Sequence, residues 1–285
     1  MNESAEFACT ACIWEVTARK LGNVHPTARF RNLDHTAFLR SADALSEALI
    51  ESQKLSVGET ILRAVRKRIA VTPSNTNLGI ILLLVPLAKS RSRNSLGELL
   101  AQLTVGDARF AFVAIRIASA GGLGDVPEQS VAEQPTVNLL EAMRLAANRD
   151  SIAQQYADGF AEIFDFGVPH LMRAFEKSGS IEAAIIECQL QWLAEFPDSL
   201  IARKCGVAAA TEVQLQARAV LADGGLSSAA GRASAVRFDR HLRSDGNRLN
   251  PGTTADLVTA CLFVALRERK LKPSDPFPWP VPDWS

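Results

Sequence analysis

Helical periodicity dominates this chain of 285 residues, and long runs of alternating apolar and polar residues are missing. Alanine and leucine, which favour helices, are abundant, whereas tyrosine occurs once. Without period-two segments the chain cannot supply the half-buried strands of a sheet. The sequence therefore predicts an all-α protein, with a single multi-helix globular domain over residues 1–270 and a proline-rich tail at 271–285.

The expected helices follow from apolar spacing and from capping residues such as Asp34, Ser56 and Thr104. A segment at 224–235, rich in Gly, Ser and Ala, is expected to be a mobile connection. The tail is expected to lie extended as a strap that packs Trp279 and Trp284 on the body, and a proline-rich ligand for a partner is the alternative. The helices are expected at 4–19, 35–52, 57–71, 76–89, 95–102, 106–118, 135–147, 149–164, 167–177, 180–195, 199–223, 232–243 and 253–269.

The charge balance restricts the partners. Lys plus Arg and Asp plus Glu both number 31, so the net charge is zero and no nucleic acid or anionic membrane is expected as a partner. The longest apolar run, Gly79 to Leu87, contains Pro86 and is far shorter than the ~20 residues of a membrane-spanning helix. The N-terminal residues lack a secretory signal pattern, so a cytoplasmic protein is expected.

Five cysteines, an odd number, favour reduced thiols. Cys9 and Cys12 form a CxxC pair that could indicate redox or metal chemistry. No second CxxC is present, and the pair lies in an amphipathic helix, so core packing is the favoured interpretation.

Two segments place polar residues directly at the start of helices that are otherwise apolar. Asn75-Thr76-Asn77-Leu78-Gly79 could be only a helix cap, or its free N–H groups could receive a phosphate. Asn250-Pro251-Gly252-Thr253-Thr254-Ala255-Asp256 has the same form. Asp256 in its first turn either complements the helix dipole or binds a metal that bridges phosphates.

A third segment starts at Asp198 and contains Arg203 and Lys204. A solvated surface helix explains it, and so does a site for a triphosphate. The same ambiguity applies to Glu15 with Lys20. His25 lies in a Gly-containing loop, where it could act as an acid or a base.

Taken together, these segments resemble the triphosphoribosyl-dephospho-CoA synthase family. The resemblance covers residues from about 10 to 268. Members of that family read PKPGLVD, NTHKG and SPGGSADLL where this chain has RKLGNVH, NTNLG and NPGTTADLV, so it looks like a divergent branch. The resemblance rests on Glu15-Val16, Arg19 to Val24, Ser41-Ala42, Asn75 to Gly79, Asp198 with Arg203-Lys204-x-Gly206, and Asn250 to Leu257.

The resemblance implies an all-α enzyme that reacts ATP with dephospho-CoA, releases adenine and forms 2'-(5''-triphosphoribosyl)-3'-dephospho-CoA. It implies carboxylates that stabilise a cationic ribose C1' and accept a proton, and Mg²⁺ with cations that hold the triphosphate. The expected catalytic residues are Glu15, His25, Asp198 and Asp256, with Asp107 and Asp150 in reserve, and His25 is expected to protonate adenine. The expected metal ligands are Glu15 and Asp256. The expected ATP-binding residues are Lys20, Asn23, Asn75, Asn77, Arg203, Lys204, Asn250, Gly252, Thr253 and Thr254.

Two alternatives remain open at this point. An α-ribosyl transferase that makes a methanopterin-type C1-carrier cofactor would keep the donor chemistry and change the acceptor. A non-catalytic helical protein that binds nucleotides is the other. The sequence also leaves open whether the chain is a monomer or a homodimer.

Overall fold

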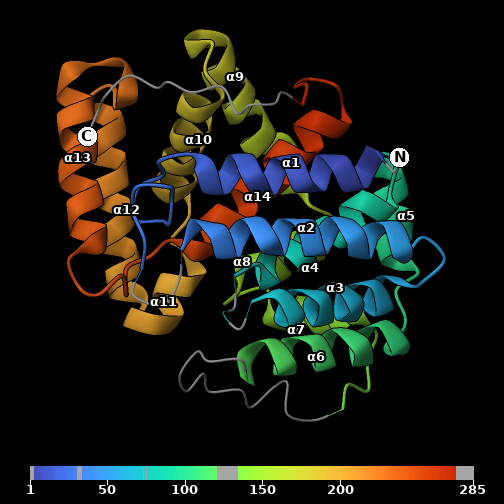
Figure 1. Cartoon of the computed structure of the whole chain (residues 1–285). Coiled ribbons are helices and arrows are strands. Elements are labelled where there is room, and N and C mark those ends of the chain that lie inside the picture. The colour runs from blue at the N-terminus through green and yellow to red at the C-terminus, as the bar shows by residue number, and fades with distance from the viewer. Residues whose placement is uncertain (1–2, 31–33, 73, 75, 121–133, 274–285) are drawn as a thin grey trace. The chain divides into compact units, whose positions relative to one another are not determined.

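The computed structural model describes residues 3–30, 34–72, 74, 76–120 and 134–273. Within these residues it has fourteen α-helices, one π-helical segment, one short 3₁₀ helix and no strand (Figure 1). An isolated antiparallel bridge joins His25 and Ala28. The predicted all-α class is confirmed.

The helices group into two compact units, one of Met1–Ile13 with Thr36–Ala161 and one of Trp14–His35 with Glu162–Ser285. The predicted domain limits at residue 270 stay a prediction. The helices that begin before residue 162 are α1 (Glu3–Thr17), α2 (His35–Glu51), α3 (Val57–Val71), α4 (Leu78–Lys89), α5 (Arg93–Ala101), α6 (Val105–Ala120), α7 (Leu139–Ala146) and α8 (Ser151–Ala157). The remaining elements are the π-helix η1 (Ile163–Gly167), α9 (Val168–Ser178), α10 (Ile181–Glu195), α11 (Ser199–Cys205), α12 (Val207–Ala222), the 3₁₀ helix η2 (Gly225–Ser227), α13 (Ala229–Arg243) and α14 (Gly252–Arg267).

In the first unit α3 packs on α4 and α6. Residues 80–87 of α4 are all buried, although Pro86 lies among them. Proline has no N–H, so it leaves the carbonyl of Leu82 without its helical donor. The hydroxyl of Tyr156 donates to that carbonyl at 2.6 Å, which satisfies a buried group that would otherwise be costly.

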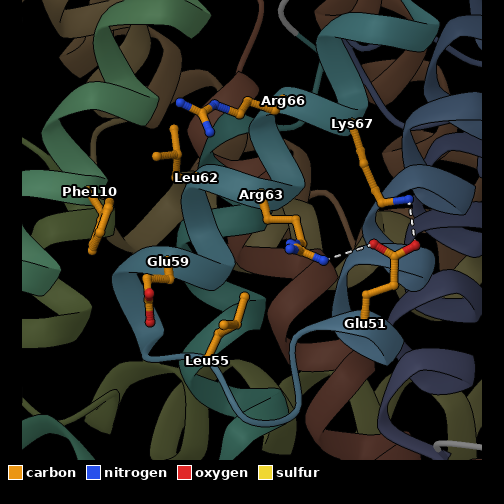
Figure 2. A pocket seen from close by; sticks show the side chains of 8 residues that line it. All are labelled: Glu51, Leu55, Glu59, Leu62, Arg63, Arg66, Lys67 and Phe110. Carbon is orange, nitrogen blue, oxygen red and sulfur yellow. Dashed lines mark hydrogen bonds and ion pairs between the residues drawn. The ribbon is translucent and has the colours of Figure 1, made fainter.

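Ion pairs join the exposed sides of α2 and α3 in the same unit (Figure 2). Glu51 pairs with Arg63 at 3.1 Å and with Lys67 at 2.8 Å. The predicted cap at Ser56 is present, because its hydroxyl accepts from the N–H of Glu59 at 3.3 Å while Glu59 accepts from the Ser56 N–H at 2.8 Å. Such a capping box fixes the first residue of α3 locally.

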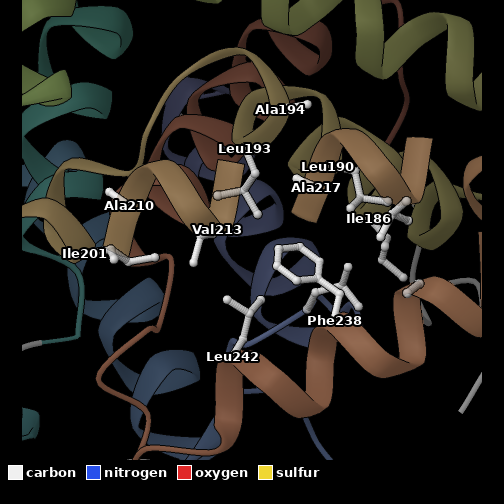
Figure 3. Packing of buried hydrophobic residues seen from close by; sticks show 13 residues of the cluster. Ile186, Leu190, Leu193, Ala194, Ile201, Ala210, Val213, Ala217, Phe238 and Leu242 are labelled. Atoms are coloured by element: carbon white, nitrogen blue, oxygen red, sulfur yellow. The ribbon is translucent and has the colours of Figure 1, made fainter. Parts of the chain in front are cut away.

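The second unit has its core where α10, α12 and α13 meet (Figure 3). Phe238 and Leu242 of α13 are both buried in this cluster. Leu21, from the loop after α1, belongs to it as well. Helix α14 is buried on nearly every side, as its apolar sequence predicts.

Three predicted elements are wrong in detail. The helix expected at 199–223 is divided by Gly206, whose φ of 90° no α-helix contains. The helix expected at 149–164 ends at Ala157, because Gly159 and Phe160 have φ of 68° and 64°. The connection expected at 224–235 instead contains η2 and the first turns of α13, which Ser228 caps.

Cys12 is buried, which fits the predicted core packing of the CxxC pair. Burial and the nearby Asp43 raise the pKa of Cys9 to about 11, so this thiol stays protonated. None of the five cysteines, all of which lie in the described part of the chain, forms a disulfide bond. The predicted packing of Trp279 and Trp284 falls outside the described residues.

Candidate functional site

Glu15 and Lys20 form a buried ion pair in the second unit. Lys20 Nζ lies 2.8 Å from Glu15 Oε1 and also donates to the Glu15 backbone carbonyl. The two residues are 4% and 1% exposed. Burial raises the pKa of Glu15, and the charge of Lys20 opposes that rise. The pair places one negative and one positive group next to each other in a region of low dielectric constant, where their mutual attraction is strong.

The loop after Lys20 is fixed by a chain of amide hydrogen bonds. Gln189 accepts from the Leu21 N–H at 2.9 Å and donates to the Leu21 carbonyl at 2.8 Å. It also donates to Asn23 Oδ1 at 2.7 Å, and Asn23 Nδ2 donates to Asn250 Oδ1 at 2.7 Å. The structure thus brings together two predicted residues, Asn23 and Asn250, that are 227 positions apart.

Helix α13 holds the other side of this loop. The Gly22 N–H donates to Asp239 Oδ1 at 2.7 Å, and Arg243 donates to the Asn23 carbonyl at 2.8 Å. Gly22 has a φ of 71°, and a Cβ there would lie 2.8 Å from Leu242 Cβ. Glycine is therefore required at this position for both its backbone conformation and its close packing.

A second buried carboxylate lies beside the pair. Glu182 Oε1 accepts from the backbone N–H of Arg19 at 2.9 Å and from its Nε at 3.0 Å. Glu182 is 0% exposed, and burial raises its pKa against the opposing effect of Arg19. With Glu15 and Lys20, these residues make the start of the loop a buried set of alternating charges.

Asp198 serves as the cap of α11 and as a link to α14. Its Oδ1 accepts from the N–H groups of Leu200 and Ile201 at 2.9 and 3.0 Å. Its Oδ2 accepts from the N–H and the hydroxyl of Thr254, each at 2.8 Å. Burial raises the pKa of Asp198, and these hydrogen bonds oppose that rise. Both oxygens are engaged, so the geometry explains Asp198 as a structural group, and its catalytic role stays a prediction.

The first turn of α14 is also partly engaged within the protein. Thr253 and Ser199 place their hydroxyl oxygens 3.1 Å apart, and the Gly252 N–H donates to the Asn250 carbonyl at 2.9 Å. A Cβ at Gly252 would lie 2.6 Å from Leu200 Cδ2, so this glycine permits close packing of α11 on α14. The phosphate-binding role predicted for Gly252, Thr253 and Thr254 stays a prediction.

Asp256 differs from its neighbours. The residues from Thr253 to Leu266 are buried, except for Asp256, which is half-buried. Asp256 is therefore the one residue between Thr253 and Leu266 that is partly exposed. Arg203 and Lys204, predicted as part of the phosphate cradle, are exposed in the last turn of α11.

His25 lies at the far end of the loop. Its ring Nδ1 is 3.2 Å from the hydroxyl oxygen of Thr27. Burial, followed by the charges of Arg243 and Lys20, lowers the pKa of His25 to about 4. At neutral pH the imidazole is therefore uncharged, and the expected protonation of adenine by His25 stays a prediction.

The first unit contains Asn77, whereas Asn75 lies outside the described residues. Asn77 is 1% exposed and precedes α4 without a capping hydrogen bond from its side chain. The neighbouring Thr76 hydroxyl is hydrogen-bonded to Ser41, another residue of the family motifs.

The two acids held in reserve both have structural roles. Asp107 accepts a hydrogen bond from the N–H of Gly58 at 2.7 Å, and Asp150 caps α8.

Two pockets lie in the first unit, and no predicted site residue lines them. One, of about 420 Å³, is lined by the ion-paired residues of α2 and α3 and by Phe110 (Figure 2). The other, of about 1110 Å³, includes Ile50 and Lys89 in its lining.

Among the described residues, no three His, Cys, Asp or Glu side chains are placed to hold a metal ion. No helix in the described part of the chain combines the length and the apolar character that crossing a bilayer requires.

Sequence reasoning missed Gln189, Asp239, Arg243 and Glu182, which fix the loop at residues 19–24. One signal was available for Gln189 and Glu182. Both are polar residues on a helix whose other members are largely apolar, and both are 0% exposed. A buried polar side chain requires a partner, and here each partner is in the loop.

Comparison with known proteins agrees with the motifs. Residues 1–275 match the family described as ATP:dephospho-CoA triphosphoribosyl transferase, which confirms the family resemblance. A Pseudomonas putida protein named probable 2-(5''-triphosphoribosyl)-3'-dephosphocoenzyme-A synthase is 33% identical over 111 residues, or 39% of each chain. The Pseudomonas aeruginosa PAO1 protein of the same name is 35% identical over 98 residues, 34% of this chain and 33% of its own.

The match thus spans about two fifths of the length of the curated relatives. A crystal structure from Archaeoglobus fulgidus, provisionally described as a triphosphoribosyl-dephospho-CoA synthase, superposes with a TM-score of 0.64 and 27% identity. It covers 81% of this chain and 98% of the other.

Proposed function

Because this chain belongs to the ATP:dephospho-CoA triphosphoribosyl transferase family, we propose that it transfers the triphosphoribosyl group of ATP to a hydroxyl of dephospho-CoA. The bond between ribose C1' and adenine N9 breaks, and a bond between C1' and the acceptor oxygen forms. The acceptor's hydroxyl proton goes to a base, and adenine leaves with a proton. Direct displacement inverts the configuration at C1'.

The observation that carries this proposal is the buried Glu15–Lys20 pair at the start of the 19–24 loop. As the bond to adenine breaks, C1' becomes cationic, and a fixed carboxylate such as Glu15 lowers the energy of that transition state. The ammonium of Lys20 complements the triphosphate, which is held and not cleaved. The amide chain through Gln189, Asn23 and Asn250 holds the loop in place before any substrate binds, which would favour positioning of the substrates.

The proton transfers need a base and an acid. Glu15 has a pKa raised by burial, which makes it a better proton acceptor than an exposed glutamate. The ring of His25 is uncharged near pH 7, and its pKa of about 4 makes it a weaker base than an ordinary histidine. We therefore propose Glu15 as the base, and protonation of adenine by His25 stays a prediction.

Mg²⁺ enters as part of MgATP and supplies charge neutralisation for the triphosphate. Of the two predicted metal ligands, Glu15 is buried in its ion pair with Lys20, whereas Asp256 is partly exposed. On this difference in exposure alone, we propose Asp256 as the residue that would hold the Mg²⁺ of MgATP.

Adenine release tests the proposal. The full chain is incubated with MgATP and dephospho-CoA, and adenine and the nucleotide product are quantified by chromatography. Adenine should appear only when both substrates are present, and Glu15→Gln should reduce kcat on the order of a hundredfold or more. Glu51→Gln, which changes a surface ion-paired glutamate in the same way, should retain activity. Binding of ATP without any adenine release would overturn the proposal.

The two alternative functions gain nothing from the comparisons. Neither an α-ribosyl transferase for a methanopterin-type cofactor nor a non-catalytic nucleotide-binding protein corresponds to the family description or to the relatives' names.

A further inference from the structure

Arg68 lies in the last turn of α3. It is a completely buried cation, and few hydrogen bonds replace the water that its guanidinium has lost. It is 0% exposed, and its Nη1 donates to the Ser74 carbonyl at 3.0 Å. Its Nε and Nη2 are buried and have no hydrogen-bond partner within the described part of the chain. A buried guanidinium in this state is unfavourable unless an anion joins it, because both its charge and its N–H groups have lost water.

The loop that Arg68 contacts leads into α4, which begins without a side-chain cap. Asn77 makes no capping hydrogen bond, and the Thr76 hydroxyl is bonded to Ser41. The first hydrogen bond of α4 is from the Ile81 N–H to the Asn77 carbonyl at 2.9 Å. The three N–H groups before it therefore have no acceptor inside the helix, and they carry the positive end of its dipole.

Asn77 is the second buried polar group without a partner at this place. It is 1% exposed, and its Oδ1 is buried with no hydrogen bond from the described residues. Asn77 Oδ1 is a hydrogen-bond acceptor, so it needs a donor such as a sugar hydroxyl. The guanidinium of Arg68 and the free N–H groups of α4 are donors, so they need anionic oxygens as acceptors. A nucleotide carries both kinds of group, a hydroxyl on its ribose and a chain of phosphates.

We infer that Arg68, Asn77 and the first turn of α4 form an anion site in the first unit that takes the polyphosphate of a nucleotide. The planar guanidinium can donate two parallel hydrogen bonds to a phosphate, and helix N-termini bind phosphates through their N–H groups. This inference rests on the proposed function for the identity of the polyphosphate. Arg68 is completely buried, so a phosphate that binds it has to displace some of the protein atoms that now surround its guanidinium.

A structural role for Arg68 makes the opposite predictions. Cations stabilise helix C-termini, and Arg68 already bonds the Ser74 carbonyl just beyond α3. If that is its only role, Arg68→Met lowers the melting temperature of the free protein and leaves phosphate binding intact. If it forms an anion site, Arg68→Met leaves the free protein as stable as before or more stable, and phosphate binding is lost.

The test measures the melting temperature of the full chain with inorganic tripolyphosphate, dephospho-CoA or sodium sulfate at matched ionic strength. Tripolyphosphate should stabilise the wild type, and Arg68→Met should weaken its apparent Kd at least tenfold. Arg66→Gln, an exposed change on the same helix, should keep the wild-type Kd. A loss confined to dephospho-CoA would assign the site to the acceptor's diphosphate. A Kd within twofold of wild type for every ligand in Arg68→Met, or no stabilisation of the wild type by either phosphate ligand, overturns the inference.

A second measurement does not depend on the variant folding. Hydrogen exchange of the wild type with and without tripolyphosphate should show slower exchange at the amides of Leu78, Gly79 and Ile80. Unchanged exchange there at saturating tripolyphosphate contradicts the site. If tripolyphosphate binds through Arg68 but no acceptor yields adenine, the proposed function fails while the anion site stands.

Discussion

Asp198 Oδ2 accepts two hydrogen bonds from Thr254, one from its N–H and one from its hydroxyl, each at 2.8 Å. Because Asp198 Oδ1 also caps α11, one carboxylate fastens the first turns of α11 and α14 together. The two motif segments at 198–206 and 250–257 thus depend on each other, although 56 positions separate Asp198 and Thr254.

Asp198→Ala should lower the free energy of unfolding by about 3–5 kcal/mol, because it removes a helix cap and leaves the buried Thr254 groups unpaired. Asn138→Ala, which removes only the cap of α7, should lower it by about 1 kcal/mol. Urea denaturation of both variants measures the difference. Equal losses would mean that the link to Thr254 adds no stability.

Tyr156 and Pro86 should be coupled through the Leu82 carbonyl. Tyr156→Phe leaves this buried carbonyl unpaired and should lower the free energy of unfolding by about 1–3 kcal/mol. In the Pro86→Ala background the new N–H of residue 86 can reach the same carbonyl, so the loss should fall below about 1 kcal/mol. A double-mutant cycle by urea denaturation measures the coupling, and additive effects of the two changes would contradict it.

Local signals explain how much of the fold could be predicted. Ser56 with Glu59 and Thr104 with Asp107 cap their helices through contacts three residues apart, so the sequence shows them directly. The end of α8 could not be predicted in this way. Phe160 has a φ of 64°, which is rare for a bulky residue, and its complete burial accompanies that backbone conformation.

In the candidate site, too, contacts between residues close in the sequence could be predicted, and contacts between distant residues could not. Glu15 and Lys20 are five positions apart in the chain, so their proximity was visible in the sequence. Gln189 contacts Leu21 across 168 positions, and such a contact follows only from the packing of α10 on the loop. The bond between Asp198 and Thr254 likewise depends on how α11 and α14 pack, so the sequence alone does not show it.

His25 should make stability fall on acidification. Its pKa in the folded protein is about 4, below the ordinary value of 6.5, so the fold favours the neutral ring. The contribution of His25 to stability is complete above about pH 6.5 and is lost as the pH falls towards 4. His25→Gln should therefore lose less stability than the wild type between pH 6.5 and pH 4, as followed by urea denaturation at each pH.

An NMR titration gives the direct check. The His25 ring resonance, assigned by its absence in His25→Gln, should have a midpoint near pH 4. A midpoint near 6.5 would mean that burial and the charges of Arg243 and Lys20 do not disfavour the charged ring, and it would support His25 as the acid.

Asp256 is the sharpest test of where the reaction takes place. Asp256→Asn keeps the size of the side chain and removes its charge from the one half-buried position between Thr253 and Leu266. The folded protein should lose little stability, since a charge near a helix start contributes only about 0.3–1 kcal/mol. Adenine release should fall on the order of a hundredfold if Asp256 has its proposed role, because the charge proposed to hold the Mg²⁺ of MgATP is lost. Asp245→Asn, at an exposed surface pair with Arg248, is the matched control and should leave activity unchanged.

The metal dependence separates the two ways in which Asp256 could act. If its carboxylate binds the Mg²⁺ of MgATP, Asp256→Asn should raise the Mg²⁺ concentration needed for half-maximal adenine release. If it only stabilises the cationic C1', kcat should fall at an unchanged Mg²⁺ requirement. Near-normal turnover together with an unchanged melting temperature would make Asp256 a structural residue. The reacting C1' would then have to lie against the buried pair of Glu15 and Lys20, where Glu15→Gln becomes the decisive variant.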